Sequence, residues 1–493
     1  MARDGALDAT YGDPGDPGDP RDAPPGAASG TSGGWERMDG LDAGFFFAES
    51  ENTPLHIASV TVFEGPAPSY GDLVRKLLSK LAGVPRYRQR VRTVPLHLGR
   101  PVWVDDPHFN ILYHVRHTAV PAPGGPEQLR NLAGRVLSQR LDPAKPLWEI
   151  WLVEGLEDGC WAAITKVHHC VVDGVGGVDL LTALFDVTPD AGPGTPAEPA
   201  PARPEPTPAA LLTESVRDVV AEPLRGIAGL PGLARRLTSP AALRGLGIEV
   251  PRVLGRIARP TTGSLNGPIG PHRRWMWTHA EMDEIRLVRK AFGGTVNDVI
   301  LATVTHGYRE VLEGRGELEP GGRIRALVPV SVRGEDERGE IRNRVSGVLV
   351  DLPVGEDDPR RRLFEIRRQM NDVKRTHQAA GGEALARLAG FAPTLMALGS
   401  RYALSQNQPL VQTVVTNVPG PDFPLYVLGR KLVGLYPFVP LAAGIRSGVA
   451  VFSYRGRLTF GLTGDFDGMP DLDALARGIR GGFDELVGLA EAA

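Results

Sequence analysis

A proline-rich segment sets the strongest limit on how this chain folds. Eight of the twenty residues at 189–208 are proline. Proline lacks a backbone N–H and has a fixed φ, so this segment cannot continue a helix or an interior strand. Its composition is typical of a stiff, solvated linker. The sequence therefore predicts a folded unit on each side of it, in agreement with a length of 493 residues.

A second segment of biased composition lies at the N-terminus. Residues 1–34 are rich in Gly, Pro, Asp and Ala and include three Gly-Asp-Pro triplets. They contain little apolar surface to bury, so we expect a disordered tail. The predicted organisation is a tail at 1–34, an N-terminal unit at 35–188, a linker with short basic helices at 189–265, and a C-terminal unit at 266–493.

Both predicted units alternate short apolar runs with amphipathic stretches, which is typical of mixed α/β folds. In the N-terminal unit we expect strands at 58–63, 147–153 and 161–167, and helices at 70–81 and 175–185. In the C-terminal unit we expect strands at 324–332, 346–352, 413–417, 448–454 and 457–463, and helices at 296–312, 359–377 and 472–490.

Charge and cysteine content narrow the function classes. The chain has 58 acidic and 55 basic residues, so no global positive field indicates a nucleic-acid partner. Two cysteines, Cys160 and Cys170, are too few for a disulfide scaffold and favour a reducing compartment. No secretory signal and no apolar run of about 18 to 20 residues is present, which predicts a soluble or peripheral protein.

One dense cluster of reactive side chains occurs where a predicted strand ends and a predicted helix begins. It contains His168, His169, Asp173 and Gly174. Adjacent residues leaving a strand point to opposite sides, so one histidine can face a cavity while the other packs inward. A neutral imidazole can take a proton from a hydroxyl. Asp173 is near a helix start, where a carboxylate is favoured, and Gly174 allows a sharp turn.

Two other interpretations of the cluster stay open on local chemistry alone. The histidine pair and Asp173 could be purely structural. His169 and Asp173 are four residues apart and could bind a metal, although no third ligand follows at metal-like spacing. Other catalytic motifs are weaker: the Gly-x-Ser-x-Gly match at 30–34 lies in the predicted tail, and there is no Walker loop or dinucleotide fingerprint.

His168-His169-x-x-x-Asp173-Gly174 resembles the HHxxxDG signature of the coenzyme A-dependent acyltransferase superfamily. From Met38 to the C-terminus the chain is similar to the bacterial wax ester synthase/diacylglycerol acyltransferase family. The matching segments are LDAGFFFAE at 41–49, PLH at 54–56, PLW at 146–148, EGL at 154–156, NGPIG at 266–270, TVND at 295–298, VPVS at 328–331, Asn343, and TNVPGP at 416–421.

This resemblance implies an α/β fold of two chloramphenicol-acetyltransferase-like sandwich domains with a central tunnel between them. It makes His169 the general base and His168 a support of the loop. Asp173, backed by Gly174, would hold the loop's shape through an arginine. Asn266, Asn297 and Asp298 would lie near the tunnel, while a role in turns and helix starts is the alternative for these three residues.

The implied reaction is acyl-CoA-dependent O-acyl transfer to diacylglycerol, giving triacylglycerol, with wax esters from long-chain alcohols as a second product. It needs no cofactor or metal, and acyl-CoA is a co-substrate. The alternative is a condensation-like or non-catalytic relative that binds acyl groups or lipids. Cys170 and Gly176-Gly177 depart from the usual family residues and affect local packing only.

Lipid acceptors imply a cytoplasmic protein that associates peripherally with a membrane or lipid droplet. The segment 211–259, with eight arginines and four acids, is the candidate contact surface, and an interdomain brace is the alternative. No nucleic-acid partner is expected. No feature predicts an oligomeric state or ranks the two acceptor classes.

Overall fold

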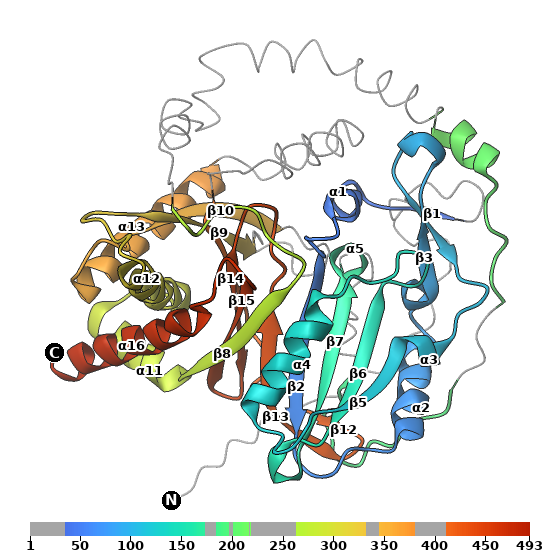
Figure 1. The fold of residues 1–493 in the computed structure, drawn as a ribbon, viewed down its shortest axis with the longest axis horizontal. Coiled ribbons are helices and arrows are strands. Elements are labelled where there is room, and N and C mark those ends of the chain that lie inside the picture. The colour runs from blue at the N-terminus through green and yellow to red at the C-terminus, as the bar shows by residue number, and fades with distance from the viewer. Residues whose placement is uncertain are drawn as a thin grey trace, which may run out of the picture.

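The computed structural model describes residues 35–172, 184–196, 201–215, 217, 263–331, 345–379 and 411–493. These residues form two α/β units that lie side by side, each built on a six-stranded sheet (Figure 1). The predicted α/β class is therefore confirmed. The predicted tail at 1–34, Asn343, nearly all of the predicted helix at 175–185 and most of 211–259 lie outside the described residues.

The N-terminal unit is a sheet with helices on both faces. Its strand order is β12-β13-β2-β7-β6-β5. The strands are β2 (His56–Phe63), β5 (Val115–Ala119), β6 (Trp148–Glu154), β7 (Trp161–His168), β12 (Tyr426–Val427) and β13 (Arg430–Phe438). The helices are α2 (Tyr70–Leu81), α3 (Ile111–His114) and α4 (Pro126–Ser138). β7 is buried along its whole length, as expected of a central strand covered on both faces.

Local sequence explains these elements well. Ser69 caps α2 by accepting a hydrogen bond from the backbone N–H of Asp72, and Leu73, Leu77 and Leu81 form its buried face. The predicted helix at 70–81 is confirmed without change. The predicted strands at 58–63, 147–153 and 161–167 correspond to β2, β6 and β7.

A hairpin from the second half of the chain completes the N-terminal sheet. β13 pairs antiparallel with β2, placing Tyr436 opposite Val60, and β12 pairs with β13. Leu432 and Leu435 of this hairpin are buried in the N-terminal core. The sequence-based division assigns residues 426–438 to the C-terminal unit. The strand hydrogen bonds of these residues instead belong to the N-terminal sheet. The pairing satisfies the backbone groups along β2, which would otherwise be an open edge.

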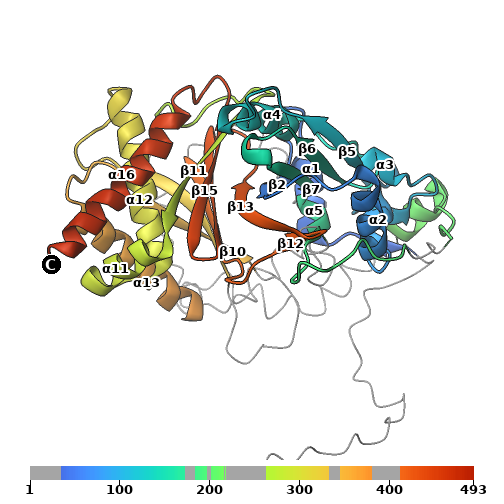
Figure 2. The same ribbon diagram turned by 90° about the horizontal axis from the view of Figure 1, so that it is seen from below.

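The C-terminal sheet carries its described helices on its outer face (Figure 2). Its strand order is β10-β9-β11-β14-β15-β8. The strands are β8 (Arg273–Glu281), β9 (Ile324–Ser331), β10 (Val345–Leu352), β11 (Thr413–Val418), β14 (Ser447–Tyr454) and β15 (Arg457–Asp465). The helices are α11 (Met282–Phe292), α12 (Val296–Gly314), α13 (Pro359–Ala379) and α16 (Leu472–Glu491). All five strands and three helices predicted here are confirmed.

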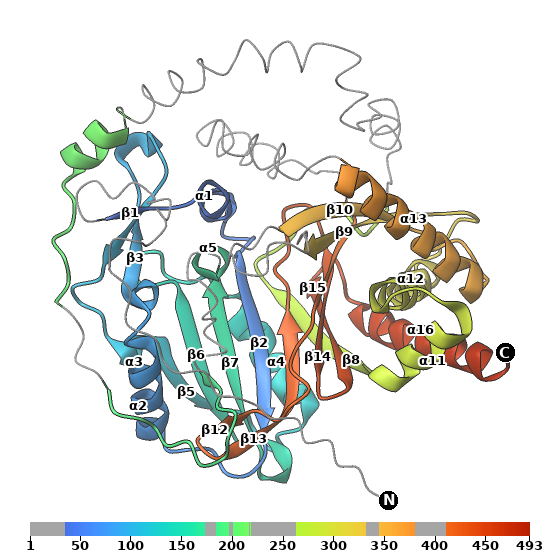
Figure 3. The same cartoon turned by 180° about the vertical axis from the view of Figure 1, so that it is seen from behind.

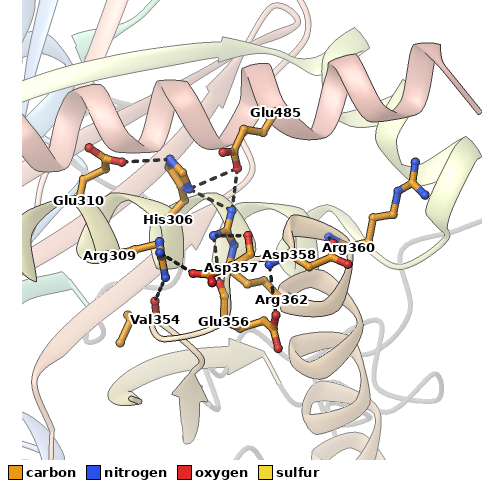
Figure 4. Close-up of polar contacts among 10 residues, drawn as sticks. All are labelled: His306, Arg309, Glu310, Val354, Glu356, Asp357, Asp358, Arg360, Arg362 and Glu485. Atoms are coloured by element: carbon orange, nitrogen blue, oxygen red, sulfur yellow. Dashed lines mark hydrogen bonds and ion pairs between the residues drawn. The ribbon is translucent and has the colours of Figure 1, made fainter. Parts of the chain in front are cut away.

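A buried polar network ties three of these helices together (Figure 4). Arg362 of α13 donates from Nη2 to Glu485 of α16 at 2.7 Å and to Nδ1 of His306 of α12 at 3.0 Å. The other ring nitrogen of His306 lies 3.6 Å from Glu310. Burial lowers the pKa of His306. The network therefore lies between α12, α13 and α16 and fixes the spacing of these three helices.

A small third sheet lies beside the N-terminal unit. It contains β1 (Glu36–Arg37), β4 (Val102–Asp105) and β3 (Gln89–Arg92), and α1 (Gly40–Ala48) follows β1 in the chain. Described parts of the proline-rich segment lie against this sheet, where Arg203 pairs with Asp105 at 3.0 Å. Leu211 is buried beside Val94 and Val102. The described beginning of 211–259 therefore packs on the N-terminal unit.

The two units meet where α4 and β13 face the second sheet. The backbone N–H of Arg273 in β8 donates to Ser138 Oγ at the end of α4, at 2.9 Å. Trp275 of β8 donates from Nε1 to the Pro437 carbonyl of β13 at 3.3 Å. None of the helices in the described ranges is long and apolar enough to span a bilayer.

Candidate active site

The two histidines lie at the junction of β7 and α5 (His169–Val172), which meets α1 at one end of the N-terminal sheet (Figure 3). The backbone N–H of His168 donates to the Leu147 carbonyl at 3.0 Å, and that of His169 donates to the Leu55 carbonyl at 2.9 Å. Both backbones are therefore fixed by neighbouring segments. The His168 side chain is 1% exposed, whereas His169 is half-buried, which is the alternation expected for adjacent residues at the end of a strand.

His168 is enclosed and neutral. Its Nδ1 accepts a hydrogen bond from the backbone N–H of Cys170 at 3.2 Å and lies 2.9 Å from the Cys170 sulfur. Its Nε2 lies 3.8 Å from a carboxylate oxygen of Glu49. Burial, with a smaller effect from His169, lowers the pKa of His168 to about 3. A ring that stays neutral and buried at physiological pH suits the support of a loop better than exchange of protons with a substrate.

α1 supplies the main described contact to the His169 ring. Phe45 stacks on the imidazole with ring centroids 4.1 Å apart and an interplanar angle of 23°. One residue later, Phe46 lies edge-on to His168 at 6.2 Å. Sequence reasoning missed both roles and used these residues only as part of a family segment. The signal was available, because three consecutive phenylalanines at 45–47 are hard to place on one buried face of a short helix.

Glu49, just after α1, anchors this helix to the rest of the site. Its Oε1 accepts from the backbone N–H of Leu55 at 3.1 Å, and its Oε2 accepts from Arg140 Nη2 at 2.7 Å. The carboxylate is thus held from two directions while facing His168. Charge-assisted hydrogen bonds of this kind fix position strongly in a buried setting. Sequence reasoning missed this role as well.

Buried basic groups beneath the histidine pair cap the end of α4. Lys166 Nζ donates to the carbonyls of Val136 at 3.0 Å and Gln139 at 2.7 Å. His56, directly opposite His168 in the sheet, has its Nε2 3.0 Å from the Leu137 carbonyl. The last carbonyls of a helix lack internal partners and carry the negative end of its dipole, so these groups complete α4.

Burial shifts the titration of both basic groups. It lowers the pKa of Lys166 to about 8, while Glu149 opposes the shift. It also lowers the pKa of His56 well below the ordinary value, and the nearby charge of Lys166 adds to the effect. The floor of the site below His168 therefore contains a neutral His56 beside the Lys166 ammonium group, which is hydrogen-bonded to the end of α4.

The remaining predicted site residues divide into two groups. Asp173 and Gly174 lie outside the described residues. Asn266 joins two loops of the C-terminal unit: its Nδ2 donates to the carbonyls of Val411 and Gly444, both at 2.8 Å. Its Oδ1 accepts from Gln412 at 2.8 Å. These contacts match the alternative role in holding turns.

Asn297 and Asp298 begin α12. Asp298 accepts from the backbone N–H of Thr295 at 2.7 Å, and the Thr295 hydroxyl accepts from the Asp298 N–H at 3.3 Å, which completes a capping box. Asn297 Oδ1 accepts from Asn417 Nδ2 at 3.0 Å, so the segments 295–298 and 416–421 meet. These partners all belong to the C-terminal unit. Across the described ranges, no group of three or more His, Cys, Asp or Glu side chains could hold a metal ion.

Comparison with known families shows which family the chain belongs to. The family model for the "Wax ester synthase/diacylglycerol acyltransferase catalytic domain" matches residues 38–300, and the model for the "WS/DGAT C-terminal domain" matches residues 341–487. The chain belongs to the wax ester synthase/diacylglycerol acyltransferase family. The resemblance identified from the short motifs is confirmed, and the protein is an acyltransferase of that family.

Relatives within the wax ester synthase/diacylglycerol acyltransferase family cover nearly the whole chain. A probable diacylglycerol O-acyltransferase of Mycobacterium tuberculosis is 36% identical over 465 residues, which is 92% of this chain and 96% of the relative. A second, putative diacylglycerol O-acyltransferase of that species is 32% identical and covers 94% and 93% of the two chains. The likeness therefore includes both units and the connection between them.

Solved structures agree on the fold. The wax ester synthase/diacylglycerol acyltransferase from Marinobacter aquaeolei superposes with a TM-score of 0.64 at 26% identity, covering 92% of this chain and 99% of that one. A trichothecene 15-O-acetyltransferase from Fusarium sporotrichioides gives a TM-score of 0.59 at 12% identity, covering 93% and 96%. The latter likeness shows a common fold alone.

Proposed function

We propose that the protein transfers a fatty acyl group from acyl-CoA to diacylglycerol and so forms triacylglycerol, with wax-ester formation from long-chain alcohols as a second reaction. Family membership and the two mycobacterial relatives support this proposal. The observation that carries it is the contrast within the histidine pair: His168 is buried and neutral, whereas the half-buried ring of His169 is held in a fixed plane by Phe45.

In the proposed mechanism His169 is the general base. It takes the proton from the acceptor hydroxyl as the oxygen attacks the thioester carbonyl. The tetrahedral intermediate then collapses, the C–S bond breaks, and the proton passes from His169 to the departing coenzyme A thiolate. No covalent enzyme intermediate is needed, and neither a cofactor nor a metal takes part in these steps. General-base catalysis of this kind contributes about 100- to 10,000-fold.

The other predicted residues have supporting roles in this proposal. His168 positions the loop from below, and Asp173 with Gly174 shapes it, with Asp173 paired to an arginine. The two substrates reach His169 through a tunnel between the units, from opposite mouths. Asn266, Asn297 and Asp298 act as positioning residues, because their described contacts hold loops and a helix start of the C-terminal unit.

The acceptors also determine where the protein works. Diacylglycerol and long-chain alcohols are found in bilayers and lipid droplets, so we place the protein in the cytoplasm at the surface of one of these. The segment 211–259 stays the sequence-based candidate for this contact. Its described start supports the brace alternative for those first residues, since Leu211 is buried in a cluster of the N-terminal unit.

The test uses the full chain, labelled palmitoyl-CoA, and both acceptors in competition, with products separated by thin-layer chromatography. Wild type should form triacylglycerol, and His169→Ala should lower the rate by about 100-fold or more. His279→Ala is the matched control, because His279 is exposed on β8. Near wild-type turnover of His169→Ala would remove this residue from the role. Binding of palmitoyl-CoA by wild type without any product would favour the non-catalytic alternative.

A further inference from the structure

The turn between β3 and β4 exposes two leucines to solvent. Leu96 is 83% exposed and Leu98 is 43% exposed. The turn includes a short 3₁₀ segment, Pro95–His97. Large apolar side chains that project together from a loop indicate a contact surface. A leucine that stays in water does not gain the free energy that burial of its side chain would contribute.

The backbone of this turn is strained and yet firmly held. Leu96 and His97 have φ values of 57° and 54°, in the left-handed region that residues with a Cβ rarely adopt. The backbone N–H of His97 donates to the Val94 carbonyl at 3.0 Å, and Val94 is 1% exposed. Strained residues persist where the surrounding structure fixes them, and they are concentrated at sites of ligand contact. The packed base of the turn thus holds Leu96 outward.

α1 links this turn to the proposed general base. The Phe47 ring contacts His97 edge-on, with centroids 5.5 Å apart, and Phe45 of the same helix stacks on His169. The turn and His169 therefore contact the same short helix, through Phe47 and Phe45 respectively. This helix lies beside α5 at one end of the N-terminal unit (Figure 3). A surface contacted by the leucines would be next to the site where the acceptor must arrive.

Charge around the turn is positive. The segment 85–104 contains five arginines, of which Arg86 is paired with Glu36 at 2.7 Å, and Asp105 and Asp106 follow directly. The Glu205 carboxylate is shared by two of them: Arg90 lies 2.6 Å from one oxygen and Arg92 lies 3.0 Å from the other. Arg100 donates to the backbone carbonyl of Met38. This surface complements the phosphates of anionic lipid head groups.

We propose that Leu96 and Leu98 insert into the lipid surface that holds the acceptor, with Arg92 and Arg100 against anionic head groups. The occupant is a phospholipid layer containing diacylglycerol. This inference rests on the proposed function in one respect: it takes the acceptor to be a lipid. It differs from the sequence-based candidate at 211–259 and concerns a separate segment of the chain.

The experiment measures co-sedimentation of the full chain with vesicles of phosphatidylcholine, phosphatidylglycerol and diacylglycerol. Leu96→Ser/Leu98→Ser should lower the vesicle partition coefficient by about 10-fold or more, because two apolar side chains lose their burial. Leu112→Ser is the matched control: Leu112 is 56% exposed and lies on α3 of the same unit. Wild-type binding by the double variant, or an equal loss in Leu112→Ser, would overturn the proposal.

Two further arms keep the result clear. Leu96→Gly removes the side chain and relieves the positive φ, so a loss of vesicle binding there cannot come from a damaged turn. Acyl transfer to a short, water-soluble alcohol should stay near wild type in all these variants, and a matching fall in that assay would overturn a lipid-contact role. If wild type shows no acyl transfer but vesicle binding still depends on the leucines, the proposed function fails and the lipid contact stands.

Discussion

The Phe45 ring lies nearly parallel to the His169 imidazole, with centroids 4.1 Å apart. Aromatic pairs in such geometry contribute about 0.5–1.5 kcal/mol beyond the burial of their surface. The contact fixes the plane of the imidazole, and this plane decides the direction in which a ring nitrogen meets a hydroxyl. α1 thus acts on the proposed base through the Phe45 side chain.

Replacing Phe45 should therefore slow the reaction without preventing folding. Phe45→Ala is expected to lower kcat by about 3- to 10-fold, which corresponds to the loss of one stacking contact. The KM for acyl-CoA should change little. Phe45→Tyr keeps the stacked ring and should restore most of the rate. An unchanged kcat in Phe45→Ala would show that the stack does not orient His169.

His168 should make the fold sensitive to acid. Its pKa is about 3 in the folded protein, against about 6.5 in an unfolded chain, so the unfolded state binds the proton more readily. The contribution of His168 to the free energy of unfolding is therefore complete above pH 6.5 and declines as pH falls towards 3. The limiting slope for one proton is about 1.4 kcal/mol per pH unit.

Urea unfolding followed by tryptophan fluorescence at about pH 7.5 and about pH 5 would measure this slope. His168→Asn should lower this slope by about 1.4 kcal/mol per pH unit, which is the contribution of one proton. His279→Asn, at an exposed position on β8, should leave it unchanged. Part of the slope should remain in His168→Asn, because burial also lowers the pKa values of His56 and His306. A slope equal to that of wild type would show that His168 does not contribute.

Asn266→Ala should lower stability and leave substrate binding alone. The substitution removes the hydrogen bonds that the Asn266 amide donates to the carbonyls of Val411 and Gly444, at an expected cost of about 0.5–1.5 kcal/mol for each bond. Thermal unfolding should register the loss, while the KM values for both substrates stay at wild-type levels. Asn371→Ala, at an exposed position on α13, is the control. A raised KM with an unchanged Tm would instead indicate direct contact with substrate.

Gly461 of β15 should tolerate no side chain. A Cβ there would lie 1.7 Å from the Pro437 carbonyl oxygen of β13. Gly461→Ala should thus push the hairpin away. The loss in the free energy of unfolding should exceed about 1–3 kcal/mol, the range that is usual for overpacking. Gly488→Ala is the control, since a Cβ at that position of α16 meets nothing within 4 Å. Gly488→Ala should leave the free energy of unfolding unchanged or raise it by up to about 1 kcal/mol. Equal denaturation midpoints for the two variants would contradict the close approach of β15 and β13.

Periodicity within one element was sufficient to predict much of the fold. α2 and the long helices α12, α13 and α16 have clear apolar spacing, and the strands β7, β9 and β14 each contain a short apolar run. α4 has the same kind of spacing in Leu129, Leu132, Val136 and Leu137, so periodicity alone indicates this helix as well. Its connection to β8 and the floor of the site depends on contacts that no local pattern contains.

The candidate site was predictable in its centre and not in its surroundings. The strand-to-helix junction placed one histidine inward and the other half outward, as the alternation of side chains requires. The stacking of Phe45 on His169 and the contact of Glu49 with Arg140 join segments separated by about a hundred residues, so spacing along the chain cannot indicate them. Asn266, Asn297 and Asp298 were expected near substrate, while their described contacts hold turns and a helix start.

The crossing hairpin also determines when the protein can assemble during synthesis. β2 is made early, but its partner β13 leaves the ribosome only after most of the C-terminal unit. At about 5–20 residues per second, the edge of β2 stays open for tens of seconds. The first unit thus lacks two strands of its sheet until the chain beyond residue 438 has been made. A gene cut between the two units would leave the N-terminal sheet without β12 and β13, and the C-terminal half would carry this hairpin without its partner β2.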